Sequence, residues 1–409
     1  MKKVFLKTFG CRTNVYDSAV MASKLKDFIL VSDEKNADII VVNSCTVTNS
    51  ADSNIRGYIS KQNKAGKKVV LAGCGAFSKG KELLESKSIF GVFGHSEKEN
   101  INDLLQKKES FYELGDLKSV DKSIVTQFQN KTKAFIKIQE GCNFECSYCI
   151  IPSVRGKARS QDEEVILKQI TTLAQNGFGE FVLTGTNMGS YGKDKKSSLA
   201  KLLKKISKIN GIKRVRLGSI EPIQIDDEFK ELLGEPFLEK HLHIALQHTN
   251  ESMLKIMRRR NSLKKDLELF EFIAQKGFAL GTDFIVGHPG ETQDIWEDAV
   301  KNFKDFPLTH LHAFTFSKRD GTHSSTLKDE VRGDIAKKRL KELETIVKEN
   351  NYNFRKYHDK NLLVLVEENN KGYDQYFNQI EIKSSQDLSK SWILIEKAKI
   401  EKEGNIAVF

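Results

Sequence analysis

Residues 141–152, Gly-Cys-Asn-Phe-Glu-Cys-Ser-Tyr-Cys-Ile-Ile-Pro, contain three of the six cysteines of the chain, Cys142, Cys146 and Cys149. Thiolates are the soft ligands that iron–sulfur clusters require, and this spacing lets three of them close around one centre within a single loop. A cubane cluster has four irons, so three cysteines leave one iron free for a ligand from outside the protein. The loop therefore predicts a cluster that can bind a small molecule.

The number and type of the ligands restrict the metal that this loop can bind. Structural zinc normally takes four protein ligands, often from paired C-x-x-C knuckles. Only Cys146 and Cys149 have that spacing here, and no histidine lies within the loop. A reducing compartment disfavours disulfides. We therefore favour an iron–sulfur cluster, with structural zinc and a disulfide framework as the alternatives.

The loop resembles the radical S-adenosylmethionine (SAM) signature, C-x-x-x-C-x-x-C, with Tyr148 before the last cysteine and Gly141 before the first. The resemblance implies a 4Fe-4S cluster whose open iron binds the amino and carboxylate groups of SAM. It also implies that one-electron reduction splits SAM and releases a 5′-deoxyadenosyl radical, which makes the three cysteines of the loop catalytic. An electron donor such as flavodoxin or ferredoxin is then an expected partner.

The cysteine loop follows the first of six β-rich segments that alternate with helical patterns from residue 133 onward. The predicted strands are 134–138, 180–183, 214–217, 241–246, 279–286 and 310–316. The predicted helices are 161–176, 197–209, 226–234, 251–275 and 291–304. Six β/α units form a full or partial barrel, whose chemistry lies at the carboxyl ends of its strands. The position of the cysteine loop agrees with that rule.

Other strand ends of this barrel carry polar or glycine-rich segments that converge on the same rim. We interpret the turn after the second strand as a site for the amino group of SAM, and Glu221 as a contact to its ribose or amine. The predicted cofactor-binding residues are Tyr148, Thr184, Gly185, Asn187 and Glu221. The densest basic run contains Arg258, Arg259 and Arg260, whose planar guanidinium groups suit contacts with substrate phosphates. A solvated helix face is the alternative for this run.

The first 115 residues also alternate between strands and helices, which predicts a doubly wound parallel sheet with helices on both faces. The predicted strands are 4–8, 38–43, 68–72 and 89–93, and the predicted helices are 16–29, 51–65, 79–87 and 97–107. Cys11, Cys45 and Cys74 follow the first three of these strands. Because the carboxyl ends of parallel strands share one edge, we expect these thiols to form a second three-cysteine cluster site. A lone buried cysteine that acts as a small hydrophobe is the alternative for each.

The remaining features concern the ends and the charge of the chain. A helix is predicted over 333–352, followed by short strands at 362–367, 375–382 and 392–398, with a turn at 369–372. We divide the 409 residues into a domain 1–120, a linker 121–132, a barrel 133–355 and a small all-β domain 356–409. The formal charge of +11 favours a polyanionic partner, although a solvated lysine-rich surface has the same composition. No apolar run has the length of a signal peptide or a membrane span, so we expect a cytoplasmic protein without membrane contact.

Taken over its whole length, the chain resembles the methylthiotransferases. The blocks that carry this resemblance, besides the cysteines, are Leu183–Asn187, Met257–Arg260 and Gly287–Thr292. The resemblance implies an auxiliary 4Fe-4S cluster on Cys11, Cys45 and Cys74, a SAM cluster in the barrel, and an RNA-binding TRAM domain at the C-terminus. Ala245–His248 and His288 depart from the usual family pattern, as does the segment Lys318–Asp320.

Within this family, Asn43–Thr48 and Ile138–Cys142 are most similar to the branch that acts on threonylcarbamoyladenosine in tRNA. We therefore expect a monomeric enzyme that adds a methylthio group to C2 of N6-threonylcarbamoyladenosine beside the anticodon, with two SAM-dependent steps and two 4Fe-4S clusters. One alternative is the same chemistry on isopentenyladenosine in tRNA or on a ribosomal protein aspartate. The other is a zinc-stabilised RNA-binding protein without catalysis.

Overall fold

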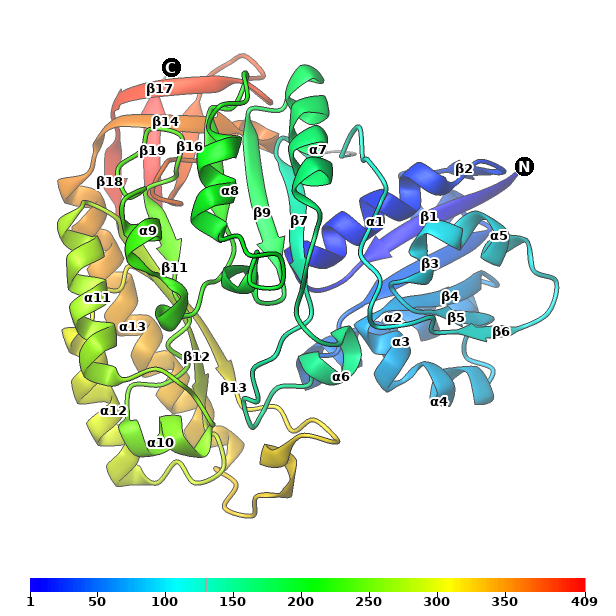
Figure 1. The fold of residues 1–409 in the computed structure, drawn as a ribbon, viewed down its shortest axis with the longest axis horizontal. Helices are drawn as coiled ribbons and strands as arrows, with labels where there is room; N and C mark the ends of the chain where they lie inside the picture. Colours follow the sequence, from blue (N-terminus) through cyan, green and yellow to red (C-terminus); the bar gives the residue numbers. More distant parts are fainter. Residues whose placement is uncertain (129–130, 409) are drawn as a thin grey trace.

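The computed structural model describes residues 1–128 and 131–408, which form four sheets with helices packed around them (Figure 1). Two residues of the predicted linker, Gln129 and Asn130, lie outside the described residues, as does Phe409. No helix in the described part of the chain is both long enough and apolar enough to cross a membrane. The mixed α/β architecture with parallel sheets confirms the predicted fold class.

The N-terminal sheet is entirely parallel and has the strand order β2-β1-β3-β4-β5-β6. Its strands are β1 (Lys2–Thr8), β2 (Phe28–Leu30), β3 (Ile39–Ser44), β4 (Lys68–Gly73), β5 (Gly91–Phe93) and β6 (Phe111–Glu113). Its helices are α1 (Arg12–Lys24), α2 (Asn49–Lys64), α3 (Cys74–Ser78), α4 (Gly80–Glu85) and α5 (Ile101–Gln106). Apolar side chains of neighbouring strand residues alternate between two separate cores, one under α1 and α5 and one under α2 and α4. The sheet is therefore doubly wound, as predicted.

The direction of winding in this sheet reverses between β1 and β3. The chain leaves β1 for β2 on one side and then returns to place β3 on the other side of β1. Adjacent loops at such a reversal diverge and leave a crevice beyond the carboxyl ends of the strands, where ligands bind. Cys11 follows β1 and Cys45 follows β3, so two of the three N-terminal cysteines lie at this reversal.

The second part of the chain forms a partial barrel of six parallel strands. They are β7 (Ala134–Glu140), β9 (Glu180–Gly185), β10 (Arg214–Leu217), β11 (His241–His243), β12 (Ala279–Val286) and β13 (His310–Thr315). Isolated bridges from Val215 to Leu238 and from Ile220 to Ile244 connect the first three strands to the last three. A short strand β8 (Arg159–Ser160) pairs antiparallel with β7. Among the described residues no pairing joins β13 to β8, so the barrel is open on that side.

Helices surround the barrel, and all of them except α10 contribute side chains to one large apolar core that they share with its strands (Figure 1). They are α7 (Glu163–Gln175), α8 (Leu199–Ile206), α9 (Asp227–Lys230), α10 (Glu251–Ile256), α11 (Leu263–Gln275), α12 (Gln293–Asp305) and α13 (Gly333–Tyr357). One further helix, α6 (Ile151–Arg155), follows the cysteine loop and packs on α3 of the N-terminal part. This contact brings the two sets of cysteines toward each other.

The prediction of a single helix over 251–275 is wrong. α10 ends at Ile256 and α11 begins at Leu263. Between them Arg258 has φ +53°, a left-handed conformation that ends a right-handed helix. The sequence offers no glycine or proline at the break, so the usual stop signals are missing. The break frees the carbonyl of Met257, which accepts a hydrogen bond of 2.9 Å from the Ser147 N–H in the cysteine loop.

The C-terminal part forms a six-stranded sheet rather than the three strands predicted from the sequence. Its strands are β14 (Lys360–Val366), β15 (Lys371–Tyr373), β16 (Gln379–Lys383), β17 (Trp392–Lys397), β18 (Lys399–Glu401) and β19 (Gly404–Val408). The order is β17-β14-β15-β16-β19-β18, and all pairs are antiparallel except β16 with β19. Arg214 and Arg216 in the barrel donate hydrogen bonds to the carbonyls of Leu363, Tyr373 and Asp374, which fixes this sheet at the base of the barrel.

Candidate functional site

The loop that carries Cys142, Cys146 and Cys149 is fixed by backbone contacts at its start. Gly141 has φ +75°, and a Cβ atom there would lie 2.0 Å from the Lys157 carbonyl oxygen. The Cys142 N–H donates to the Gly156 carbonyl at 3.0 Å, and the Thr186 hydroxyl donates to the Gly141 carbonyl at 2.8 Å. Only glycine fits this turn, so the loop leaves β7 in one defined direction.

The three sulfurs of this loop line a cavity of about 510 Å³. The Asn187 side chain donates to the Cys142 sulfur at 3.2 Å, and the Phe144 N–H donates to the same atom at 3.3 Å. Arg259 lies 3.6 Å from the Cys146 sulfur. Burial raises the pKa of the Cys149 thiol to about 12, so this thiol needs the positive charge of a bound metal in order to ionise. Soft donors, hydrogen bonds to sulfur and room for a large group together fit an iron–sulfur cluster.

The residues that we predicted to bind SAM have different surroundings in the structure. The Asn187 side chain contacts the cluster loop through its amide nitrogen, and its amide oxygen accepts a hydrogen bond of 2.7 Å from the Gln224 side chain. The Glu221 carboxylate pairs with Arg259, with one N···O distance of 2.9 Å. The Thr184 hydroxyl faces the N-terminal part, where it lies 3.3 Å from the Thr13 hydroxyl.

Two other predicted SAM-binding positions are closely packed. Gly185 lies against the backbone of Gln139, whose carbonyl oxygen would be 2.9 Å from a Cβ atom at position 185. The ring of Tyr148 meets the His288 ring edge to face, with a centroid distance of 6.4 Å, and borders a second cavity. The structure therefore brings Asn187 and, through Arg259, Glu221 to the cluster loop.

The three consecutive arginines of the basic run point in different directions because they lie in the break between α10 and α11. Arg258 borders the cavity at the cluster loop. The Arg259 side chain is 2% exposed and is held by Glu221 and the Ala245 carbonyl. The Arg260 guanidinium lies over the Phe144 ring at 4.7 Å. The sequence alone could not show that Arg259 is the buried arginine of the three, because this depends on where the backbone breaks between α10 and α11.

The cysteines of the N-terminal part gather at the carboxyl edge of their sheet. Cys11 precedes α1, Cys45 follows β3, and Cys74 is the first residue of α3. The loops of Cys11 and Cys45 are in close contact, since a Cβ atom at Gly10 would lie 2.5 Å from the Cβ atom of Cys45.

Arg155 at the end of α6 connects the two cysteine sets, a role that the sequence did not reveal. It is fully buried, and its Nε donates to the Cys74 sulfur at 3.2 Å. Its Nη1 lies 2.9 Å from the Asp17 carboxylate and 2.5 Å from the Glu140 carboxylate. The same two carboxylates bind Lys137, at 2.7 and 2.9 Å. Burial alone would raise the pKa of Glu140, but Lys137 and Arg155 hold it well below its usual value.

A second cavity of about 260 Å³ borders both the cluster loop and the segment that follows Cys45. The cluster loop contributes Tyr148–Ile151, which include its last cysteine. The segment after Cys45 contributes Val47 and Thr48. Ile285 of β12 and Phe314 of β13 complete a largely apolar lining. The cavity is therefore shared by the N-terminal sheet and the barrel.

Comparisons with known proteins identify family models for both the N-terminal part and the barrel, and several similar proteins. A model described as the radical SAM superfamily matches residues 136–303, and one described as uncharacterized protein family UPF0004 matches residues 3–94. A Helicobacter pylori (strain J99) protein, named provisionally as a methylthiotransferase, is 52% identical over 100% of both chains. A threonylcarbamoyladenosine tRNA methylthiotransferase of Aquifex aeolicus is 34% identical over 84% of this chain and 87% of the relative. A tRNA-2-methylthio-N(6)-dimethylallyladenosine synthase of Sulfurovum is 31% identical over 84% of each chain.

Two solved structures share the fold at low sequence identity. The radical SAM methyltransferase TsrM of Kitasatospora setae has a TM-score of 0.57 and 14% identity, over 79% of this chain and 77% of that chain. The cobalamin-dependent SAM radical enzyme OxsB has a TM-score of 0.54 and 12% identity, over 87% of this chain and 58% of that chain. Both likenesses cover a larger share of this chain than the barrel alone, and they show a similarity of fold.

Proposed function

This chain belongs to the radical SAM methylthiotransferases, and from that premise we propose that it adds a methylthio group to C2 of N6-threonylcarbamoyladenosine beside the anticodon of tRNA. Family membership makes the protein an enzyme that uses a 4Fe-4S cluster and SAM, and it removes the alternative of a non-catalytic zinc protein. The choice of nucleoside rests on the named relatives and on the motifs around Cys45 and Cys142.

The cavity that Cys149 and the segment after Cys45 share is the observation that supports the chemistry of this proposal. Cys142, Cys146 and Cys149 would hold the SAM cluster on one side, and Cys11, Cys45 and Cys74 would hold a second cluster on the other. When bound, the SAM cluster and SAM supply a radical that can remove hydrogen from a carbon without acid–base reactivity. The C2 position of adenine is such a carbon, and an apolar cavity that borders both sites would receive the base.

The roles of the chain's own residues follow from their contacts. Ile285 and Phe314 give the cavity an apolar lining, which would exclude water once a base fills it and would protect a reactive species from side reactions. Arg259 is locked by Glu221 beside the Cys146 sulfur, so its positive charge has a fixed position near the cluster loop. Asn187 orients the Cys142 sulfur by a hydrogen bond.

The partner in this proposal is tRNA, and the positive charge of the protein supports it. The formal charge is +11, and phosphate contacts by lysine and arginine supply most of the non-specific affinity for nucleic acid. We assign the C-terminal sheet as an RNA-binding domain and a flavodoxin or ferredoxin as the electron donor. Isopentenyladenosine in tRNA remains the second candidate substrate, because a relative at 31% identity is named for the dimethylallyl nucleoside.

Mass spectrometry of nucleosides tests the substrate directly. Total tRNA from a strain that lacks the gene is expected to lose 2-methylthio-N6-threonylcarbamoyladenosine and to accumulate the unthiolated nucleoside. The dimethylallyl nucleoside and its methylthio form are measured in the same digest as an internal control. Loss of the methylthio form from the dimethylallyl nucleoside instead would assign the second substrate, and an unchanged profile for both would exclude tRNA.

Blocking the shared cavity tests the location of the substrate. Val47 is 48% exposed and lines the cavity together with the cluster loop. We expect Val47→Trp to lower methylthio transfer to tRNA by about 100-fold or more, because displacement of a reacting atom by about 1 Å costs that much. Iron content and SAM cleavage without tRNA should stay unchanged, since no cysteine is altered. Full transfer activity in this variant would place the substrate elsewhere.

A further inference from the structure

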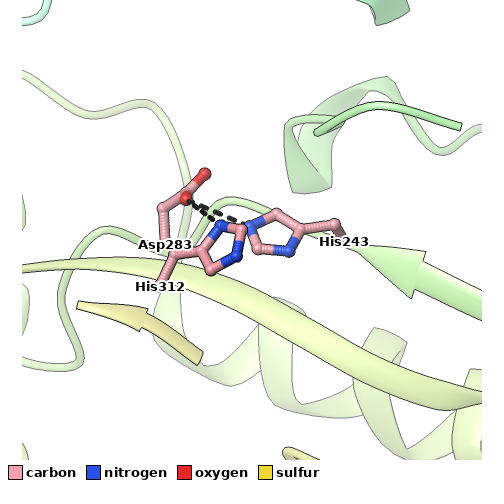
Figure 2. A group of neighbouring side chains, drawn as sticks. All are labelled: His243, Asp283 and His312. Carbon is pink, nitrogen blue, oxygen red and sulfur yellow. Dashed lines mark ion pairs between the residues drawn. The ribbon is translucent and has the colours of Figure 1, made fainter. Parts of the chain in front are cut away.

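Three side chains from three adjacent strands of the barrel, none of them a cysteine, converge on one point. They are His243 on β11, Asp283 on β12 and His312 on β13 (Figure 2). The Nε2 atom of His243 lies 3.1 Å from the Asp283 carboxylate, and the Nδ1 atom of His312 lies 3.7 Å from the same oxygen. All three ligand atoms lie within 4.8 Å of one another. Two imidazoles and one carboxylate thus converge on one point.

The register of the strands produces this convergence. Asp283 is directly opposite His312 in the pairing of β12 with β13. His243 is opposite Gly281 in the pairing of β11 with β12, two residues before Asp283 and therefore on the same face of the sheet. A Cβ atom at Gly281 would lie 2.8 Å from the His243 ring, so this glycine gives the imidazole its space. Regular paired strands hold donors more precisely than loops do.

The geometry of the three donors matches a first-row metal site. Two histidines and one carboxylate form the set that leaves open coordination positions on a divalent ion. Metal–ligand bonds of about 2.0–2.2 Å place neighbouring donors roughly 3–3.5 Å apart, close to the two distances observed here. The Nε2 atom of His243 is buried and lies 3.1 Å from the Asp283 carboxylate, without a hydrogen bond of acceptable geometry among the described residues. Its lone pair can therefore be directed at an ion that the carboxylate also binds.

We propose that His243, Asp283 and His312 bind a divalent first-row transition metal ion, separate from the two cysteine sets. The second oxygen of Asp283 accepts a hydrogen bond of 3.3 Å from the Ser219 hydroxyl, which orients the carboxylate as outer partners of metal ligands do. The His312 side chain is 62% exposed, so the ion would have open positions toward solvent. Asp283 also borders the second cavity, so an oxygen of a bound substrate could complete the shell.

Electron paramagnetic resonance of Mn²⁺ tests this site in the cluster-loaded enzyme. Free Mn²⁺ gives a sharp signal that disappears on binding, so anaerobic titration counts binding sites without any reaction. We expect about one Mn²⁺ bound per chain, and competition by Zn²⁺, which binds such donor sets more tightly than Mn²⁺. Asp283→Asn and His243→Gln should each weaken this binding by 10-fold or more.

The matched control is His310→Gln. His310 lies on the same strand as His312 and two residues earlier, so it has the same face but is not among the three converging donors. The His310→Gln variant should bind Mn²⁺ as the unaltered protein does, and iron content should be equal in all variants. Absence of stoichiometric binding, or equal binding in Asp283→Asn and the unaltered protein, would show a hydrogen-bonded His–Asp–His group without metal. Either result overturns the proposal, and neither depends on the identity of the RNA substrate.

Discussion

Replacing Arg155 by methionine is expected to lower the free energy of unfolding by about 3–5 kcal/mol, because it leaves buried carboxylates with too few positive partners. Asp17 and Glu140 are 2% and 3% exposed, and each contacts the Arg155 guanidinium. Methionine has a similar length but no charge, so the change removes the ion pairs with little change in volume. The measurement is urea-induced unfolding of the cluster-loaded protein under anaerobic conditions.

The matched control for this variant is Arg159→Met. Arg159 contacts the same Glu140 carboxylate at 3.5 Å, and its side chain is 12% exposed. Because Lys137 and Arg155 still pair with Glu140 when this longer contact is removed, we expect a smaller loss of about 1 kcal/mol. Iron content should also fall in Arg155→Met only, since Arg155 donates to the Cys74 sulfur. Equal losses of stability in both variants would contradict a special role for Arg155.

Strand and helix periodicity was enough to predict the order of the main elements. The predicted strands 38–43 and 68–72 correspond to β3 and β4, and the six strands predicted from residue 134 onward correspond to the six parallel barrel strands. The three cysteines of the N-terminal part were assigned to one edge because parallel strands share a direction. Simple topological rules were therefore sufficient to predict the fold class and the sheet edge at which the N-terminal cysteines lie.

Short and edge elements could not be predicted in the same way. β2 and β6 have three residues each, which is too few for a periodic pattern to be recognised. β2 (Phe28–Leu30) also overlaps the end of the predicted helix 16–29. β15 and β18 also have three residues each, and β19 enters the C-terminal sheet by pairing with β16, which is not its neighbour in the chain. The break at Arg258 contains no glycine or proline. Its left-handed backbone conformation is therefore set by contacts with the surrounding residues rather than by a local sequence signal.

The clusters of side chains were the features that the sequence predicted least. Arg155 meets Asp17 across a sequence separation of 138 residues, and its sulfur contact depends on the packing of α6 against α3. His243, Asp283 and His312 meet only because β11, β12 and β13 pair in a particular register. A shift of one residue would turn each side chain to the other face of its strand. The sequence contains these residues but not the register that joins them.

Two cysteine variants are expected to separate the functions of the two sites completely. If each set of three thiols holds one 4Fe-4S cluster, Cys45→Ala and Cys146→Ala should each retain about half of the iron, roughly four of eight atoms. Cys146→Ala should lose reductive SAM cleavage, because the cluster that binds SAM is missing. Cys45→Ala should retain SAM cleavage and yet form no methylthio nucleoside, because that cysteine belongs to the other set.

Each of these variants serves as the control for the other, since both remove one thiol from a three-thiol site. Iron analysis, the yield of 5′-deoxyadenosine and nucleoside mass spectrometry give three independent measurements on each protein. Full iron content in Cys45→Ala would exclude the N-terminal cysteines as cluster ligands and would favour packing or zinc for them. Loss of SAM cleavage in both variants would instead indicate that the contact between α3 and α6, through Arg155 and Cys74, makes the two sites fold as one unit. The retained cleavage in Cys45→Ala therefore decides whether two separable sites face the shared cavity.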